Sequence, residues 1–230
     1  MKSYSIYLIR HGLTKGNTEA RYIGHTDEPL SDEGKAQIKK MKEDYDYPET
    51  QIVFSSPLSR CIETSKIIYP GIEPIEMEGL IEYNFGEFEG KTAAELENHP
   101  VFADWLAGKK GVEAPFGESN ETFGKRIAQT FIKIVDGLLK TGTRSCAIVT
   151  HGGVLSALMS FFALPEAQIH EWAVPGGCGY ELRVIPSLWS QGKKREAVAQ
   201  IPYVPGERDE DYVSADEFDS DFNVEDYLYD

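Results

Sequence analysis

The fold is decided by one stretch near the start of the sequence, Ile6-Tyr7-Leu8-Ile9-Arg10-His11-Gly12-Leu13-Thr14-Lys15-Gly16-Asn17. Its first four residues form a short apolar run with β-branched and aromatic members, which predicts a buried strand that has ended by Gly12. Arg10 and His11 therefore lie where strand becomes loop. In an open α/β sheet, ligands bind at the carboxyl ends of the strands. A cation beside an imidazole at that place indicates chemistry on an anion.

A second stretch far along the chain repeats this arrangement. Cys146-Ala147-Ile148-Val149-Thr150 is an apolar run that predicts another strand, and it ends in His151-Gly152-Gly153. Because the carboxyl ends of parallel strands meet at one edge of a sheet, we expect His151 to lie close to His11.

A third strand, predicted at Ile52-Val53-Phe54, runs into Ser55-Ser56-Pro57. Ser before Pro predicts a helix start, in which the Ser56 hydroxyl caps the helix and Pro occupies its first position. Arg60 then falls in the first turn, at the positive end of the helix, where a cation needs an anion nearby. The sequence therefore predicts that two histidines and two arginines converge at one sheet edge.

Strands alternate with helices along the chain, which implies a mainly parallel sheet covered by helices on both faces. The further elements expected are a helix after Ser31, a strand at Pro74–Met77, a long amphipathic helix from Ser119 to about Gly142 with Phe123, Ile127, Phe131, Ile134 and Leu138 on its apolar face, a helix after Gly153, and a strand at Tyr180–Val184 that could pair with residues 195–203.

An irregular segment of about forty residues, 80–119, interrupts this pattern and is typical of a lid or binding insertion. Thr92 and Glu95 form a capping box that opens a short helix within it. The segment's aromatic residues have two interpretations, an apolar wall for a ligand or a small core of the insertion itself. These residues are Phe85, Phe88, Phe102, Trp105 and Phe116.

The composition is that of an ordinary globular protein, with 230 residues, 41% apolar and 27% charged. We expect one domain over residues 1–206, with the lid inserted at about 80–119, followed by a tail. Residues 1–4 lead directly into the first strand, which leaves no room for a secretory apolar segment and predicts a cytoplasmic protein that is not bound to a membrane. Cys61, Cys146 and Cys178 are odd in number and widely spaced, so buried thiols are expected rather than disulfides or a zinc site. His25, His99 and His170 are expected at the surface.

The net charge of −15 is concentrated at the end of the chain. Residues 207–230 carry eleven acidic residues and one arginine, a net of −10, which leaves −5 for the rest. No basic stripe is present, so nucleic-acid binding is disfavoured. The tail has two interpretations: a solvated, disordered segment, or an acidic and aromatic segment that docks on a protein partner or on its own body.

The converging groups suit a phosphate monoester. Two forked guanidinium groups can neutralise the dianion, and an imidazole whose pKa they depress stays neutral and nucleophilic. A carboxyl group from the lid could then protonate the departing alkoxide. No metal or other cofactor is expected.

Four blocks, in order and spacing, resemble the histidine phosphatase superfamily, also called the phosphoglycerate mutase-like family. They are Arg10-His11-Gly12-x-Thr14-x-x-Asn17, Ser55-Ser56-Pro57-Leu58-x-Arg60-x-x-x-Thr64, Leu80-x-Glu82-x-x-Phe85-Gly86-x-x-Glu89-Gly90 and Thr150-His151-Gly152-Gly153. The resemblance runs from about Tyr4 to Tyr203. It implies a three-layer α/β/α sandwich and a metal-independent phosphohistidine mechanism.

The resemblance also assigns roles to residues. His11 is the expected nucleophile, and Glu82 is the expected proton donor and later the base that activates water. Arg10, Arg60 and His151 form the expected phosphate clamp. Asn17, Gly24 and Gly152 complete the expected substrate-binding set. On the residues alone, four neighbouring acids could share the role of Glu82: Glu76, Glu78, Glu87 and Glu89.

Departures from the family pattern favour a phosphatase over a mutase. Ile23 is apolar where the family's mutases carry a hydroxyl. Leu13 stands where many members have an acid, a departure expected to alter only the rim of the pocket. The lid lacks the mutase Glu-Arg-His-Tyr-Gly run, and its only lysines or arginines are Lys91, Lys109 and Lys110. We therefore expect a phosphatase for a small phosphorylated metabolite, and the resemblance allows an α-ribazole phosphatase or a broad-specificity enzyme. The alternatives are a phosphoglycerate mutase and a non-catalytic module that binds a phospho-ligand or a partner. The sequence gives no indication of the oligomeric state.

Overall fold

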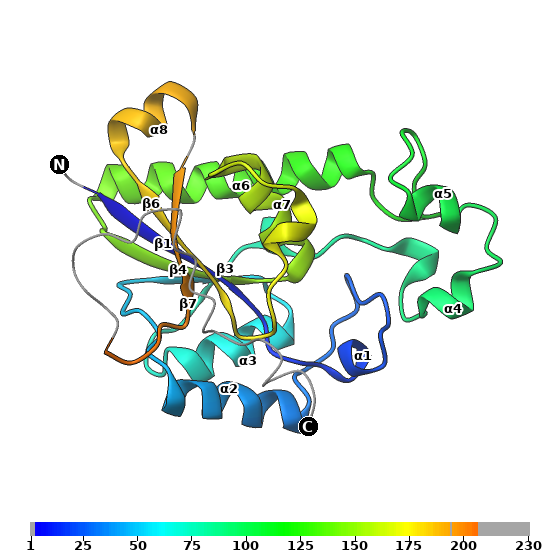
Figure 1. Cartoon of the computed structure of the whole chain (residues 1–230), viewed down its shortest axis with the longest axis horizontal. Coiled ribbons are helices and arrows are strands. Elements are labelled where there is room, and N and C mark those ends of the chain that lie inside the picture. Colours follow the sequence, from blue (N-terminus) through cyan, green and yellow to red (C-terminus); the bar gives the residue numbers. More distant parts are fainter. Residues whose placement is uncertain (1–2, 194, 207–230) are drawn as a thin grey trace.

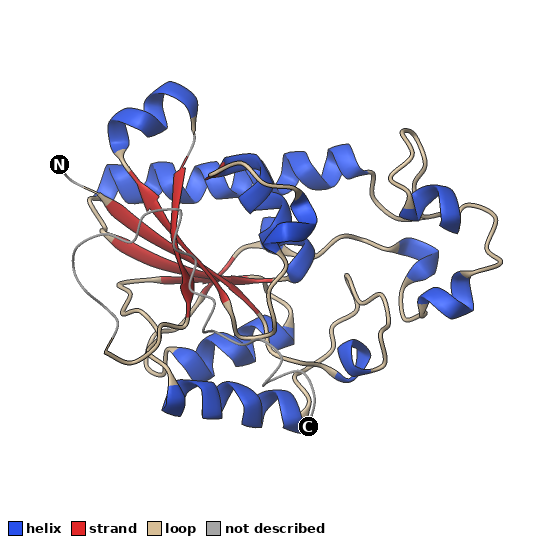
Figure 2. Cartoon of the chain, viewed as in Figure 1, coloured by secondary structure: helices blue, strands red, loops and turns tan. Residues whose placement is uncertain are grey.

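The computed structural model describes residues 3–193 and 195–206, and these residues form a central sheet with helices on both faces (Figure 2). Across the sheet the strand order is β3-β2-β4-β1-β6-β7-β5. The strands are β1 (Tyr4–Arg10), β2 (Val53–Ser55), β3 (Ile75–Glu76), β4 (Ser145–Thr150), β5 (Ala163–Leu164), β6 (Gly179–Val184) and β7 (Arg195–Ile201).

The strands β1 to β4 pair in parallel, and β6 is antiparallel to both of its neighbours, β1 and β7. The mainly parallel sheet is therefore confirmed, and so is the antiparallel pairing expected between the last two long strands. The centre of the sheet is formed by β1 and β4, where Leu8, Ile9, Ile148 and Val149 are fully buried. Continuous apolar runs of this kind suit strands covered on both faces.

Helices cover the two faces of the sheet as separate layers (Figure 1). On one face lie α2 (Asp32–Asp44) and α3 (Ser59–Ile68), and on the other lie α6 (Asn120–Thr141) and α7 (Gly152–Phe162). The three-layer α/β/α sandwich is confirmed. The shorter elements are α1 (Lys15–Thr18), α4 (Ala93–Leu96), α5 (Phe102–Leu106), α8 (Pro186–Gly192), and the 3₁₀ helices η1 (Glu78–Leu80), η2 (Gly86–Phe88) and η3 (Ile169–Trp172).

The helices α2 and α6 begin as the sequence predicts, and α6 also ends where expected. The Ser31 hydroxyl accepts a hydrogen bond from the Gly34 N–H at the start of α2, and Ser119 accepts one from Thr122 at the start of α6. Gly142 ends α6 with φ of 77°, a left-handed conformation that glycine adopts without a steric cost. The expected apolar face of α6 is buried along its whole length.

One local prediction is wrong. The helix after β2 begins at Ser59, and its cap position, Leu58, has no side-chain capping bond, so Ser56 does not cap it. The carboxylate of Asp27 instead accepts hydrogen bonds from the N–H and hydroxyl of Ser59, at 2.7 and 2.9 Å. The structure also has a short helix that the sequence analysis did not predict, α1, where Thr14 and Asn17 form a capping box.

The lid segment contains η2, α4 and α5 and has a small core of its own. Phe88, Leu96, Phe102 and Ala114 are buried together, and Phe85 and Trp105 pack against them. Phe116 departs from this group, since its side chain is 85% exposed. Of the two interpretations of the lid aromatics, the small core therefore describes all of them except Phe116.

The remaining sequence expectations concern buried thiols, surface histidines and the tail. Cys61, Cys146 and Cys178 are buried and free, as expected. His25 and His170 are exposed, whereas His99 is half-buried with its ring edge-on to Phe88, 5.0 Å between centroids. The acidic tail, 207–230, lies outside the described residues. Within the described ranges, the structure has no helix that is both long and apolar enough to cross a bilayer.

Replacing Phe131 on α6 by alanine tests the packing between helices and sheet. Phe131 is fully buried and its ring lies 5.1 Å from that of Phe162. Phe131→Ala should lower the free energy of unfolding by about 3–5 kcal/mol in urea titrations, because it leaves a cavity. The matched control is Phe116→Ala, the same chemical change at an exposed position, which should stay within about 0.5 kcal/mol of wild type. Equal losses in the two variants would contradict this description of the core.

Candidate active site

His11 follows β1 directly and is 5% exposed. Its backbone N–H donates to the Thr150 carbonyl at 2.9 Å, and the next N–H, of Gly12, donates to Thr64 Oγ1 at 3.0 Å, so the turn is fixed from two sides. In the side chain, Nδ1 lies 2.7 Å from the Gly12 carbonyl oxygen. Because a carbonyl can only accept, Nδ1 must carry the proton and Nε2 must carry the free lone pair.

The electrostatic surroundings keep this imidazole neutral. Burial is the main cause that lowers the pKa of His11 well below its ordinary value, and the nearby Arg60 and Arg10 guanidinium groups add to it. A neutral ring with Nε2 unprotonated is the form in which histidine acts as a nucleophile.

His151 stands at the end of β4, at the cap position of α7, and is fully buried. Its Nδ1 accepts a hydrogen bond from Arg60 Nε at 3.2 Å, so its proton lies on Nε2, which donates to Ser56 Oγ at 2.8 Å. The His11 and His151 rings meet edge to face with 5.1 Å between centroids. Burial, followed by His11 and Arg60, lowers the pKa of His151 well below its ordinary value.

Arg60 reaches this place from the first turn of α3 and is 1% exposed. Besides its bond to His151, its Nη1 donates to the Thr26 carbonyl at 2.8 Å and its Nη2 to the Gly24 carbonyl at 2.7 Å. A guanidinium has more N–H donors than these contacts use, so Arg60 can still donate to an anion.

Arg10 approaches from the end of β1. Its Nη1 donates to the Val174 carbonyl at 2.6 Å, whereas its Nε is buried without a hydrogen-bond partner among the described residues. If residue 152 had a side chain, its Cβ would lie 3.3 Å from this Nε. Because residue 152 is glycine, there is free space between the Arg10 guanidinium and the start of α7. An unpaired buried donor is costly, and a bound oxyanion would satisfy it.

Glu82, 7% exposed, comes from the segment between η1 and η2. Its two carboxyl oxygens accept hydrogen bonds from the N–H groups of Tyr83 and Gly153, each at 2.8 Å. Burial raises the pKa of Glu82 above its ordinary value, although these two bonds and the arginines oppose the shift. The carboxyl group therefore lies at the first turn of α7, beside the loop that carries His151.

The other acids considered for this role lie elsewhere. Glu76, Glu78 and Glu87 are exposed. The Glu89 carboxylate accepts hydrogen bonds from the N–H groups of Gly24 and His25 and from the Thr26 hydroxyl, and so holds the loop whose carbonyls bind Arg60. Glu82 is the acid of this group that contacts the first turn of α7, two residues after His151.

Two expected substrate-binding residues have structural contacts in the described residues. Asn17 is the third residue of α1 and forms the capping box with Thr14. Its Oδ1 accepts a hydrogen bond from the Thr14 N–H at 3.1 Å. Gly24 packs so closely on the lid that a Cβ would lie 1.9 Å from the Tyr83 carbonyl oxygen. Their contacts with a substrate remain predictions. The structure thus brings together Arg10, His11, Arg60, Glu82, His151 and Gly152.

Sequence reasoning missed several residues that position the site. Arg126 on α6 and Glu118 before it bind the backbone around Glu82. Ser56 was expected to cap a helix but binds His151. Tyr22 joins the lid aromatics, with its ring 5.3 Å from that of Phe85. The signal that could have drawn attention to Glu118 is its position directly before Ser119, the cap of α6.

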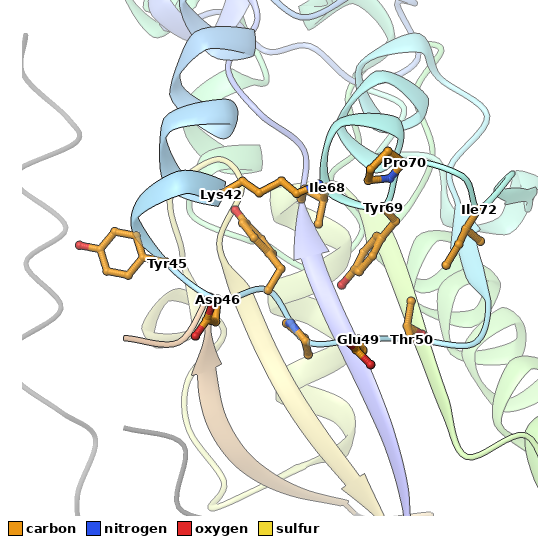
Figure 3. A pocket seen from close by; sticks show the side chains of 11 residues that line it. Lys42, Tyr45, Asp46, Glu49, Thr50, Ile68, Tyr69, Pro70 and Ile72 are labelled. Atoms are coloured by element: carbon orange, nitrogen blue, oxygen red, sulfur yellow. The ribbon is translucent and has the colours of Figure 1, made fainter. Parts of the chain in front are cut away.

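A separate cavity of about 420 Å³ lies between the carboxyl-terminal ends of α2 and α3 (Figure 3). It contains none of the expected site residues. Its lining includes Lys42, Tyr45, Tyr47, Tyr69 and Pro70.

Comparison with known proteins agrees with this geometry. The sequence profile of the histidine phosphatase superfamily (branch 1) matches residues 6–192. The chain belongs to that superfamily. Among related proteins, it is 28% identical to an adenosylcobalamin/alpha-ribazole phosphatase of Salmonella typhimurium, over 75% of this chain and 87% of the relative. It is also 28% identical to a 2,3-bisphosphoglycerate-dependent phosphoglycerate mutase of Gloeobacter violaceus, over 74% and 83% of the two chains.

Among solved structures, the fold matches the alpha-ribazole phosphatase of Shigella flexneri with a TM-score of 0.72. The match covers 84% of this chain and 94% of the other, at 22% identity, and it shows that the two proteins share a fold. The superfamily membership expected from the four sequence blocks is confirmed.

Gly153→Ala should impair this phosphatase site, because the new Cβ would lie 2.5 Å from Glu82 Oε1 and push the carboxyl group away. We expect hydrolysis of an alkyl phosphate to fall about tenfold or more. The control is Gly137→Ala in α6, where a Cβ meets nothing within 4 Å. It should leave the rate unchanged and raise stability by about 0.5–1 kcal/mol, as glycine-to-alanine changes in helix interiors do. An unaffected rate in Gly153→Ala would contradict the close packing of Glu82 on α7.

Proposed function

We propose that this histidine phosphatase hydrolyses a small phosphate monoester through a phosphohistidine on His11, with Glu82 as the proton donor. The observation that carries the proposal is a buried imidazole whose Nε2 lone pair is free and whose pKa is lowered in part by two nearby guanidinium groups. The same site contains the buried Glu82 carboxyl group, whose pKa is raised. These are the groups that phosphoryl transfer to nitrogen requires.

In the first half-reaction, the lone pair of His11 Nε2 attacks phosphorus as the ester P–O bond breaks. The proton of the Glu82 carboxyl group passes to the departing alkoxide, which leaves as an alcohol. In the second, water attacks the phosphohistidine, Glu82 takes a proton from that water, and the N–P bond breaks to release phosphate. Arg10 and Arg60 would neutralise the phosphoryl oxygens in both steps. A direct contact of His151 with the phosphate stays a prediction, because its Nε2–H donates to Ser56 Oγ in this structure.

The lid favours hydrolysis over the mutase alternative that the Gloeobacter relative represents. Lys109 is paired with Asp104 at 3.0 Å, and Lys91 and Lys110 are exposed. Ile23 packs against Gly16, so position 23 presents an alkyl group rather than a hydroxyl. A mutase must retain a bisphosphate intermediate between half-reactions, and such a lid offers that anion few cations.

For the substrate, the relatives named alpha-ribazole phosphatase support a phosphorylated metabolite of that kind as the first candidate to test. We propose such a small-molecule ester as the ligand of the site. The cytoplasmic location and the role of residues 207–230 stay predictions.

His11→Asn should lower the rate of phosphate release about a thousandfold or more, because it removes the nucleophile. The control is His170→Asn, at an exposed position, which should keep wild-type activity. Wild-type activity should persist in EDTA, and rapid quenching should trap an acid-labile phosphate on wild type that is absent from His11→Asn. Sensitivity to EDTA, or an active His11→Asn variant, would contradict the mechanism.

Assays of the purified wild-type protein distinguish a phosphatase from a phosphoglycerate mutase and from a non-catalytic binding module. A phosphatase should release phosphate without interconverting 3- and 2-phosphoglycerate when 2,3-bisphosphoglycerate is supplied. A binding module should retain phosphorylated ligands without turnover.

The pH profile follows from opposite pKa shifts. Because the pKa of His11 is lowered, the nucleophile stays neutral and kcat/KM for an alkyl phosphate should persist below about pH 6.5, the ordinary histidine value. Because the pKa of Glu82 is raised, its acid form survives above the ordinary carboxyl range, and activity should fall as the pH rises through that pKa. Glu82→Gln should remove this alkaline limb, whereas ionisation of the substrate affects both proteins equally. An identical profile in the two proteins would contradict the assignment of Glu82.

A further inference from the structure

The segment that carries Glu82 is held by an arginine of α6. Arg126, on α6, donates to the Ile81 carbonyl at 2.7 Å, the Glu82 carbonyl at 3.2 Å and the Gly79 carbonyl at 3.3 Å. One guanidinium therefore binds the backbone on both sides of residue 81. Its fork of donors makes this possible, whereas the single ammonium of a lysine cannot match it.

Glu118 completes the arrangement from the residue before the α6 cap. Its carboxylate accepts from Arg126 Nη2 at 2.5 Å and from the Asn84 N–H at 2.9 Å. Its backbone N–H donates to the Asn84 carbonyl at 3.1 Å, and its carbonyl accepts from the Tyr83 hydroxyl. Arg126 thus binds carbonyl groups of Glu82 and of residues before it, and Glu118 binds Tyr83 and Asn84, the two residues after Glu82.

This pair matters because residues 81–85 have no regular secondary structure to fix them. The Glu82 carboxyl group touches the N–H groups of Tyr83 and Gly153, and the first of these belongs to the same segment. The position of the carboxyl group relative to α7 is therefore set by what holds the backbone. The side chains of Arg126 and Glu118 are 24% and 11% exposed, so their charges interact in a partly dry environment.

We propose that Arg126 and Glu118 are positioning residues that hold Glu82 where it can deliver its proton to the leaving group. Neither residue touches the reacting atoms. The inference rests on the proposed function, in which Glu82 is the general acid. It predicts a defect confined to the step that needs the proton.

Two esters with different leaving groups provide the test. The leaving group of an alkyl phosphate is a strongly basic alkoxide, which requires a proton from a general acid. The leaving group of p-nitrophenyl phosphate is much less basic and requires little protonation. Arg126→Met should lower the single-turnover rate at which the alkyl ester phosphorylates His11 by about 10- to 100-fold. This is the size of effect expected when a catalytic group is displaced. With p-nitrophenyl phosphate the fall should be less than about 3-fold if positioning alone is lost.

Further variants separate positioning from charge and from folding. Arg126→Lys keeps the positive charge that helps to lower the pKa of His151 but cannot bind three carbonyls, so it should show the same selective defect. Glu118→Gln keeps an oxygen acceptor and should show a smaller defect of the same kind. Lys125→Met, at the exposed neighbouring position, is the matched control and should behave as wild type with both esters. Thermal melting of each variant gives its folded fraction, and rates are compared per folded molecule.

The outcomes distinguish this inference from the proposed function. If Glu82→Gln selectively slows the alkyl ester but the Arg126 and Glu118 variants slow both esters equally or neither, the positioning role is wrong and the function stands. If Glu82→Gln itself shows no selectivity, the general-acid assignment fails first. If Arg126→Met does not fold, the Arg126→Lys and Glu118→Gln results decide in the same way.

Discussion

The parallel pairing of β1 with β4 is the constraint on which the site depends. Arg10 lies opposite Thr150 in the register, and the His11 N–H adds one more bond to the Thr150 carbonyl. Both strands therefore end at the same level, and the two following histidines meet with 5.1 Å between ring centroids. A slip of one residue would turn every side chain of one strand to the other face of the sheet and separate the rings.

In the described part of the chain, the positive charges of Arg10 and Arg60 are not cancelled by acidic partners, so they remain available to an anionic ligand. Burying guanidinium groups is expensive unless their donors are satisfied. Here the groups that bind Arg10 and Arg60 are mostly backbone carbonyls, from Val174, Gly24 and Thr26. Carbonyl oxygens satisfy N–H donors without cancelling the positive charge, so the potential remains available to an anion. The histidines respond by staying neutral, which avoids further like charge in the same place.

Local patterns were enough to predict the strands that carry the histidines and the helix α6, since continuous apolar runs and a four-residue repeat report burial directly. They failed where a distant partner decides the outcome. The start of α3 depends on the carboxylate of Asp27, 32 residues earlier, and this left the Ser56 hydroxyl for His151. Arg126 was missed for a similar reason. An arginine off the apolar stripe of a helix has the pattern of a surface residue, and only the folded lid shows the three carbonyls that it binds.

One physical cause, exclusion of water, prepares both partners of the proposed reaction. Burial disfavours the charged form of any group, so it lowers the pKa of His11 and raises that of Glu82. Burial thereby favours the neutral form of the nucleophile and the acid form of the proton donor. This places a demand on the lid, because a lid open to water would return both groups toward their ordinary values. The contacts that hold the lid segment in place are the small core around Phe88 and Phe102 and the close packing of Gly24 on Tyr83. In the proposed reaction, an insertion with its own core would therefore contribute to the chemistry, because Glu82 belongs to it and depends on burial for its raised pKa.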